Sequence, residues 1–195
     1  EDIYLPYRPK RKSKANIARQ KGLALLAVCI EGQDDGATPE ERALDFLSFE
    51  RRVPTIASAI EGALHIVADR VSENTDYRKW LRETMFKDGK VQARVTKAKK
   101  EEKTKYSMYY EYDEPVARIP SHRMLAVRRA AREKVLTFSI QVDHEKAVSE
   151  LKSRFTIKPD SSNGKLMEQA IEDGYHRLLE PSIQNEVRRD LRDRA

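Results

Sequence analysis

The stretch TIASAIEGALHIVADRVS at residues 55–72 decides the predicted fold of this chain. Its apolar side chains recur at the three- and four-residue spacing of one helix face. They are Ile56, Ile60, Ala63, Leu64, Val67 and Val71. A second helix follows at residues 76–87, with Tyr77, Trp80, Leu81 and Met85 on one face. Burial stabilises a fold by about 1.5–3 kcal/mol per large side chain, so these stripes are predicted to form the core of a helical bundle.

Capping and turn residues predict further helices around this core. Thr38, Pro39 and Glu41 make a capping box that opens a helix running to about Ser48, the third member of the bundle core. Ser13 is placed to N-cap a short helix that starts at Lys14 and carries Ile17 and Ala18 on its inner face. The same reasoning predicts helices at about 23–30, 121–133, 145–155, 165–179 and 181–194.

One segment alternates strictly between two sets of side chains. In residues 135–142, Leu136, Phe138, Ile140 and Val142 alternate with Val135, Thr137, Ser139 and Gln141, which is the period of a β-strand. Its best partner within the chain, residues 91–95, has only a weak strand pattern, and a partner outside the chain is the other option. We therefore expect a mainly α fold, an irregular multi-helix array with at most one short β element at about residues 135–142.

Composition suggests four segments of one continuous helical region. Residues 1–36 are a basic strap with short helices, and residues 37–96 are the helical core. Residues 97–113 are a basic linker with a tyrosine-rich end, and residues 114–195 hold a helix, the short strand and the C-terminal helices. The first residue is not Met, and we expect the chain to be a piece of a longer protein.

Several classes of protein are excluded by composition. The chain has 195 residues, of which 36% are charged and 39% hydrophobic. The longest nearly apolar run, residues 22–30, is far shorter than the roughly 20 residues that cross a bilayer, so no membrane span is expected. The single cysteine, Cys29, excludes an internal disulfide and a CxxC pair and suits a reducing compartment. We expect a cytoplasmic protein.

No pattern in the chain predicts catalysis. His65, His122, His144 and His176 lack metal-ligand spacing, and no glycine-rich phosphate loop is present. Ser121 precedes His122 at a helix start, where a capping role is favoured over a catalytic dyad. We expect no enzymatic activity, no metal and no cofactor.

The net charge of +6 is concentrated in three basic blocks. Residues 1–30 carry +5, residues 91–110 carry +4 and residues 118–134 carry +5. Such blocks are either solvated surfaces or contacts for a polyanion, because neutralising phosphates releases counterions. The candidate nucleic-acid contacts are Arg8, Lys10, Arg11, Lys12, Lys14, Arg19, Arg123, Arg129 and Arg132. Arg128 borders the buried stripe of its helix, and a structural ion pair is expected there.

A tyrosine cluster follows the lysines of residues 97–105. Tyr106, Tyr109 and Tyr110 are either a platform on which bases stack or core side chains on one helix face. Core packing is the favoured interpretation.

Two motifs resemble those of a known family. The first is EDIYLPYRPKR at residues 1–11, followed by Ala18-Arg19 and Lys21-Gly22-Leu23. The second is Glu114-Pro115, followed by IPSHR at residues 119–123 and Leu125-Ala126. Together they resemble the Tex proteins, the bacterial transcription accessory proteins. The chain departs from the family at Ala130 and Lys134, where the family has glycines. These departures leave the C-terminal end of the helix predicted at about residues 121–133 undetermined.

The resemblance implies the central helical region of a Tex protein, lying before its RNase-H-like, helix-hairpin-helix and S1 domains. The implied partners are those domains, RNA or single-stranded nucleic acid bound through the full-length protein, and RNA polymerase. We expect a non-catalytic scaffold with auxiliary basic contacts to RNA or DNA. The alternative is a purely structural or protein-interaction module whose basic surface packs on acidic parts of the same protein or of the transcription machinery.

Overall fold

The computed structural model of the chain describes residues 13–33 and 36–194. It divides into two compact units, each built from separate stretches of the sequence. Within the described ranges, unit 1 comprises residues up to Asn74 together with Val148–Leu178. Unit 2 comprises Thr75–Ala147 together with the residues from Leu179 onward. No helix in the described ranges is both long and apolar enough to cross a bilayer.

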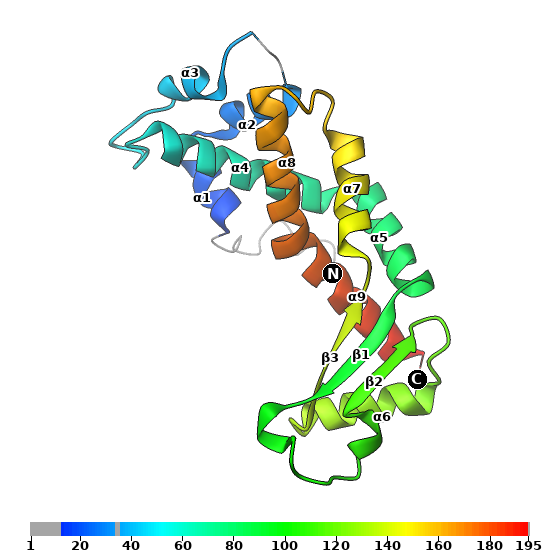
Figure 1. Cartoon of the computed structure of the whole chain (residues 1–195). Helices are drawn as coiled ribbons and strands as arrows, with labels where there is room; N and C mark the ends of the chain where they lie inside the picture. The colour runs from blue at the N-terminus through cyan, green and yellow to red at the C-terminus, as the bar shows by residue number, and fades with distance from the viewer. Residues whose placement is uncertain (1–12, 34–35, 195) are drawn as a thin grey trace, which may run out of the picture. The chain divides into compact units, whose positions relative to one another are not determined.

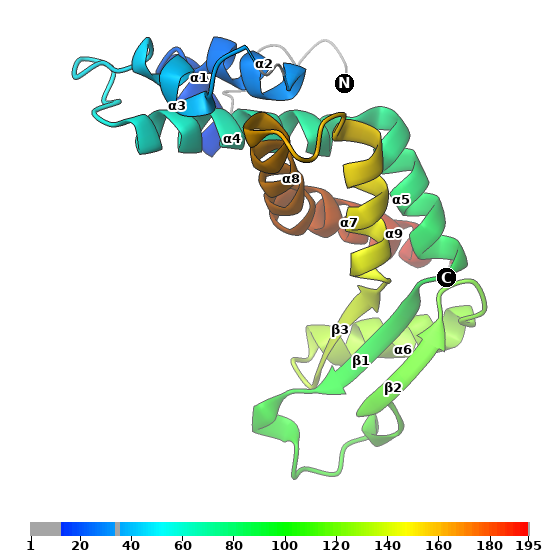
Figure 2. The same ribbon diagram turned by 45° about the horizontal axis from the view of Figure 1, so that its top comes forward.

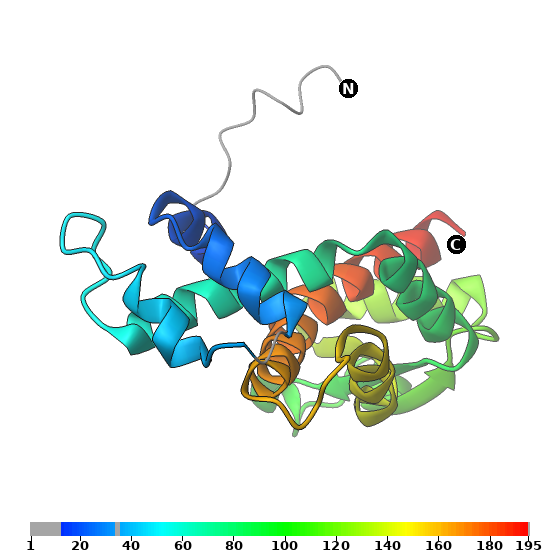
Figure 3. The same cartoon turned by 90° about the horizontal axis from the view of Figure 1, so that it is seen from above.

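Unit 1 is helical, and its longest helix lies in the middle. The helices are α1 (Lys14–Gln20), α2 (Ala24–Gly32), α3 (Pro39–Leu44), α4 (Ile56–Glu73), the C-terminal part of α7 (His144–Phe155) and α8 (Ser162–Gly174). Helix α4 packs against α1, α2, α3 and α8 (Figure 3). Gly174 permits the approach of α8, since a Cβ atom there would lie 2.8 Å from the Ala68 carbonyl oxygen.

Two predicted helix starts of unit 1 are confirmed, whereas the helix expected from about residue 165 begins at Ser162. Thr38 forms the expected capping box with Glu41, and the Ser13 hydroxyl accepts a hydrogen bond from the Asn16 amide at 3.1 Å. Thr38 opens a helix that ends at Leu44, four residues before the predicted end. Ile17 was expected to face inward, but it is 42% exposed.

The buried face of α4 differs from the predicted stripe. Ala63, Val67 and Val71 are buried as expected, whereas Ile56, Ile60 and Leu64 are only half-buried. The other fully buried apolar positions of α4 are Ala59, Ile66 and Ala68. Three of the six buried apolar positions of α4 are alanines, whose small side chains let neighbouring helices approach closely.

Gln33 joins two distant parts of unit 1. It follows α2 with a left-handed backbone (φ 50°), and only 1% of it is exposed. Its amide nitrogen donates to the Phe155 carbonyl at 2.7 Å. Its amide oxygen accepts from the backbone amides of Ile157 and Lys158, at 2.8 and 3.0 Å. One buried side chain thus holds the connection between α7 and α8.

Unit 2 combines helices with a small sheet. Its elements are α5 (Thr75–Lys87), β1 (Lys90–Val95), β2 (Glu111–Pro115), α6 (Ser121–Arg132), β3 (Leu136–Gln141), the first turn of α7 and α9 (Glu180–Asp193). The π-helical stretch Tyr175–Leu179, of which only Leu179 belongs to unit 2, precedes α9. The strands form an antiparallel sheet in the order β2-β1-β3, and α6 covers one face (Figure 1).

The sheet corrects the predicted fold class, which allowed at most one short β element. Strand β3 was expected, but it pairs with β1 inside the chain, with Val91 opposite Ile140. On the other side of β1, Val91 lies opposite Glu114 of β2. The sequence of β2, EYDEP, has little strand propensity, and it is extended because β1 satisfies its backbone. Pairing between distant residues, rather than local pattern, therefore defines two of the three strands.

The outer edge of β3 is covered by α9. The Arg188 guanidinium donates to the Phe138 carbonyl at 2.5 Å and lies 4.7 Å from the centre of the Phe138 ring. The Ile140 amide donates to the Gln184 side chain at 3.3 Å. Burial lowers the pKa of Arg188, although the Glu180 carboxylate opposes that effect. These contacts satisfy backbone groups that an open strand edge would leave unpaired.

The tyrosine cluster packs into the core of unit 2. Tyr106 and Tyr109 are 5% and 9% exposed and lie in one cluster with Val127, Ala130 and Leu136. Core packing, the favoured interpretation, is therefore confirmed for these two rings. They stand on and beside a short 3₁₀ turn at Ser107–Tyr109, not on the predicted helix face.

The two ends of α6 differ slightly from the predicted ones. Pro120 takes the N-cap position expected for Ser121. At the other end, Lys134 has a left-handed backbone (φ 58°), so a lysine occupies the conformation that glycine adopts most easily.

Candidate nucleic-acid interface

The first basic block is only partly described by the structure. Arg8, Lys10, Arg11 and Lys12 lie outside the described residues. Lys14 is exposed at the start of α1. Arg19 donates to Asp69 of α4 at 2.8 Å and to Asn16 at 3.0 Å, so its charge is neutralised inside unit 1.

Arg123 is also paired within its own unit. It lies 3.2 Å from a carboxylate oxygen of Glu114, whose side chain is 17% exposed and also accepts a hydrogen bond from the Tyr112 hydroxyl. Glu114 and Arg123 both belong to the second sequence motif, and their contact joins β2 to the first turn of α6. Arg128 donates to the Arg188 carbonyl at 3.1 Å, so the ion pair expected for it is replaced by a contact with a backbone carbonyl.

Two basic blocks that are separate in the sequence meet at one end of unit 2. The Thr96 amide donates to the Val135 carbonyl at 2.9 Å, and the Thr96 hydroxyl donates to the Lys134 carbonyl at 3.0 Å. These bonds place the segment after β1 beside the end of α6 (Figure 1 and Figure 2). We call the exposed cations gathered there the basic end; they are Lys97, Lys100, Lys103, Lys105, Arg129, Arg132 and Lys134.

Few carboxylates neutralise the basic end. Glu133 accepts a hydrogen bond from the Tyr106 hydroxyl at 2.9 Å and lies 3.6 Å from the Lys105 ammonium. Contact with Tyr106, followed by the Glu133 carboxylate, raises the pKa of Lys105, so its charge is retained at neutral pH. Glu102 is paired with Lys99. Within the described ranges, the other cations of the basic end make no ion pair.

The candidate contacts predicted from the sequence include Arg129 and Arg132 of the basic end but none of its lysines. Their charge was visible as the second basic block, yet a run of lysines does not reveal which surface it joins. The contact between Thr96 and Lys134 supplies that information.

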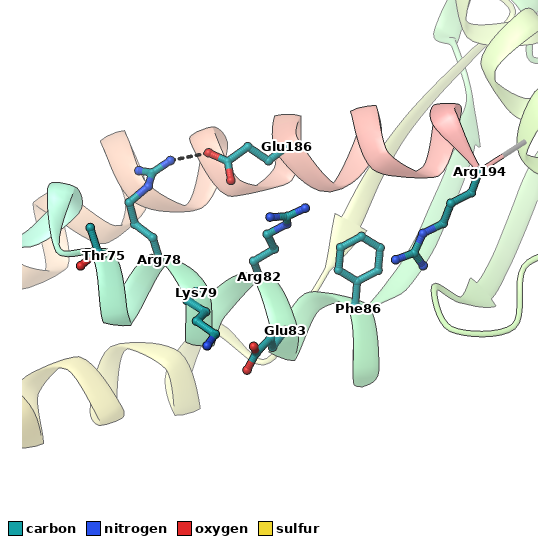
Figure 4. Close-up of a pocket in the computed structure, with 8 residues that line it drawn as sticks. All are labelled: Thr75, Arg78, Lys79, Arg82, Glu83, Phe86, Glu186 and Arg194. Carbon is teal, nitrogen blue, oxygen red and sulfur yellow. Dashed lines mark hydrogen bonds and ion pairs between the residues drawn. The ribbon is translucent and has the colours of Figure 1, made fainter. Parts of the chain in front are cut away.

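A groove between α5 and α9 holds further cations. It encloses about 570 Å³ (Figure 4). Arg78 donates to Glu186 at 2.5 Å and to Ser182 at 2.9 Å, and Arg82 pairs with Asp190. The Arg194 guanidinium lies 4.5 Å from the centre of the Phe86 ring. The arginines of α5 are therefore engaged by α9, and the groove is a structural contact between two helices of unit 2.

The fold and the basic end define a class: a helical region with a small antiparallel sheet and a polycationic surface. Among the described residues, no three His, Cys, Asp or Glu side chains form a group that could hold a metal ion. Comparison with protein families gives a specific match, because the family described as Tex central region-like matches residues 34–195. The chain belongs to the Tex family, as part of its central region.

Individual relatives agree with this assignment. YdcI of Bacillus subtilis is 40% identical over 202 residues, covering 100% of this chain and 27% of YdcI. Protein tex of Bordetella pertussis is 32% identical over 143 residues, covering 73% of this chain and 18% of that protein. The transcriptional accessory protein Tex of Neisseria gonorrhoeae is 34% identical over 141 residues, covering 72% and 18%. The chain thus spans about a quarter or less of these relatives.

Proposed function

We propose that this central region is a non-catalytic scaffold that adds cationic contacts to RNA or single-stranded nucleic acid bound by a Tex protein. The basic end carries this proposal, because it gathers exposed cations from two sequence blocks and leaves most of them without a carboxylate. Such a surface attracts phosphates and gains free energy when counterions are released.

A salt series on the 195-residue chain tests the proposal. The variant Arg129→Gln/Arg132→Gln/Lys134→Gln removes three charges of the basic end. On single strands each phosphate contact contributes about 0.7 to the slope of log affinity against log salt, so this variant is expected to reduce the slope by up to about 2. Affinity for a single-stranded RNA is measured from about 50 mM salt upward.

The matched control removes the same charge elsewhere in unit 2. Lys79, Lys87 and Lys146 are exposed, and Lys79→Gln/Lys87→Gln/Lys146→Gln changes the net charge equally. Its slope is expected to stay at the wild-type value. Undetectable binding at about 50 mM salt, or equal slopes for the two triple variants, would rule out phosphate contact by the basic end.

A purely structural role is the second candidate, and two ion pairs favour it. Arg19 and Arg123 are held by Asp69 and Glu114, so two predicted contact residues serve the fold. On this alternative the basic end packs on an acidic surface of the same polypeptide or of the transcription machinery. It predicts that the 195-residue chain fails to bind RNA, while a full-length Tex protein carrying the basic-end triple variant loses stability.

A further inference from the structure

Helix α6 has a second, largely exposed face beside its buried one. Met124, Val127 and Ala130 are the buried residues of the helix. His122, Leu125, Ala126 and Arg129 follow one another at the three- and four-residue spacing of a different face. They line a cavity of about 420 Å³ together with Lys105 and Met108, and we call this cavity the α6 pocket.

The walls of the α6 pocket are apolar and aromatic, and its rim is cationic. Met108 is 75% exposed and Leu125 is 47% exposed, although both are large apolar side chains. Tyr106 and Tyr109 reach the pocket from the core cluster. Lys105 and Arg129 supply positive charge, and none of the described residues that line the cavity has a carboxylate side chain. Its volume lies within the roughly 300–1,000 Å³ typical of small-molecule sites.

The charges around the pocket favour a nucleotide as its occupant. Lys105 and Arg129 belong both to the pocket and to the basic end, so a base in the pocket would have its own phosphates beside further cations. The Arg129 side chain makes no hydrogen bond or ion pair with any described residue, and its planar guanidinium is free to lie against a base or to contact a phosphate. A single-stranded nucleic acid carries a negative charge at every nucleotide, so its phosphates can meet the cations of the pocket and the others of the basic end.

We propose that the α6 pocket accepts one nucleobase of a single strand whose phosphates contact the basic end, an inference that rests on the proposed function. The base packs between the Leu125 and Met108 side chains, against the edges of the two tyrosines. Packing of this kind does not depend strongly on the base, because every base has an apolar face. The α6 pocket therefore adds affinity for bases to the basic end, which otherwise binds only phosphates.

The test compares a single-stranded oligonucleotide with an abasic strand of the same length and charge. Wild-type chain is expected to bind the base-bearing strand at least about tenfold more tightly, because the base buries apolar surface between Leu125 and Met108. In Met108→Ala/Leu125→Ala this ratio falls close to one, while the salt slope is unchanged because no charge is removed. The control Leu25→Ala/Leu44→Ala truncates two exposed leucines of unit 1 and keeps the wild-type ratio.

A second variant gives an independent result by filling the pocket. Ala126→Leu adds bulk inside the cavity from a position that is half-buried, and it is expected to lower the ratio in the same way. Circular dichroism spectra identical to wild type establish that both variants fold.

Each possible outcome decides between the two proposals. Absence of binding to both strands overturns the proposed function and this inference with it. Salt-dependent binding with equal affinity for both strands, or a ratio that survives both variants, overturns the inference alone. Binding of an acidic peptide carrying one phenylalanine, lost in Met108→Ala/Leu125→Ala and unaccompanied by a base preference, would assign the pocket to a protein partner and also overturn it.

Discussion

Replacing Gln33 tests how unit 1 holds its α7–α8 connection. Gln33→Ala removes the hydrogen bonds to Phe155, Ile157 and Lys158. Each is expected to contribute about 0.5–1.5 kcal/mol net. Ile157 and Lys158 are exposed, so water can partly satisfy their amides once the side chain is gone. We therefore expect the free energy of unfolding to fall by about 2–4 kcal/mol.

The backbone conformation of Gln33 offers a second, matched variant. Gln33→Gly loses the same hydrogen bonds, but glycine adopts a φ of 50° without strain. It is expected to be about 0.5–1 kcal/mol more stable than Gln33→Ala. Gln20 is an exposed residue of α1 whose side chain has no hydrogen bond to a described residue, and Gln20→Ala is therefore the control. It should leave stability within about 0.5 kcal/mol of wild type.

Urea denaturation and native-state hydrogen exchange measure these effects. Denaturation gives the free energy of unfolding, and exchange reports the local loss of protection at the amides of Ile157 and Lys158. The reasoning is refuted if Gln33→Ala costs less than about 0.5 kcal/mol and both amides keep their wild-type protection.

Three further predictions concern other described side chains. The pKa of His65 is lowered from 6.5, chiefly by burial and then by the charges of Lys14 and Arg177. The unfolded chain therefore binds a proton that the native chain does not, and the free energy of unfolding decreases as pH falls below 6.5 toward the folded-state pKa. His65→Gln should flatten the fall in unfolding free energy between about pH 7.5 and about pH 5, and an unchanged profile would contradict this. Arg188→Ala removes the side chain that covers the edge of β3 and is expected to lower the free energy of unfolding in urea by about 1–3 kcal/mol. It should also speed hydrogen exchange of the Ile140 amide, and unchanged exchange would refute the covering role of Arg188. Tyr77→Phe deletes a buried hydroxyl that donates to the Ala147 carbonyl at 2.5 Å, and a thermal melt should report a loss of about 1–2 kcal/mol, against which an unchanged melting temperature would count.

The helices of this protein were predictable because their signals are local. The predicted capping box of Thr38 and Glu41 spans three positions and forms as expected. Thr55 caps α4 through Ser58 in the same local way. The buried face of α4 was harder to predict from the sequence, because the helices that bury Ala59 and Ala68 rather than Ile60 come from elsewhere in the chain.

The sheet and the state of each cation depend on distant partners. Strand β2 is charged along its length and becomes a strand through β1, about twenty residues earlier. The basic blocks were visible in the sequence, but the sequence does not show that Asp69 neutralises Arg19, fifty positions away, while Arg132 stays free of any described carboxylate. Charge can be counted from sequence, whereas its pairing is a property of the fold.

The discontinuous composition of unit 1 has a consequence for protein synthesis. Helix α4 ends at Glu73, but α8, one of the helices that bury it, begins at Ser162, about 90 residues later. A ribosome adds roughly 5–20 residues per second, so α8 is synthesised about 5–18 s after α4. During that interval α4 can pack against α1, α2 and α3, but the side chains that later contact α8 stay uncovered. An apolar surface uncovered for that long is a site at which an unfinished chain can associate with other chains.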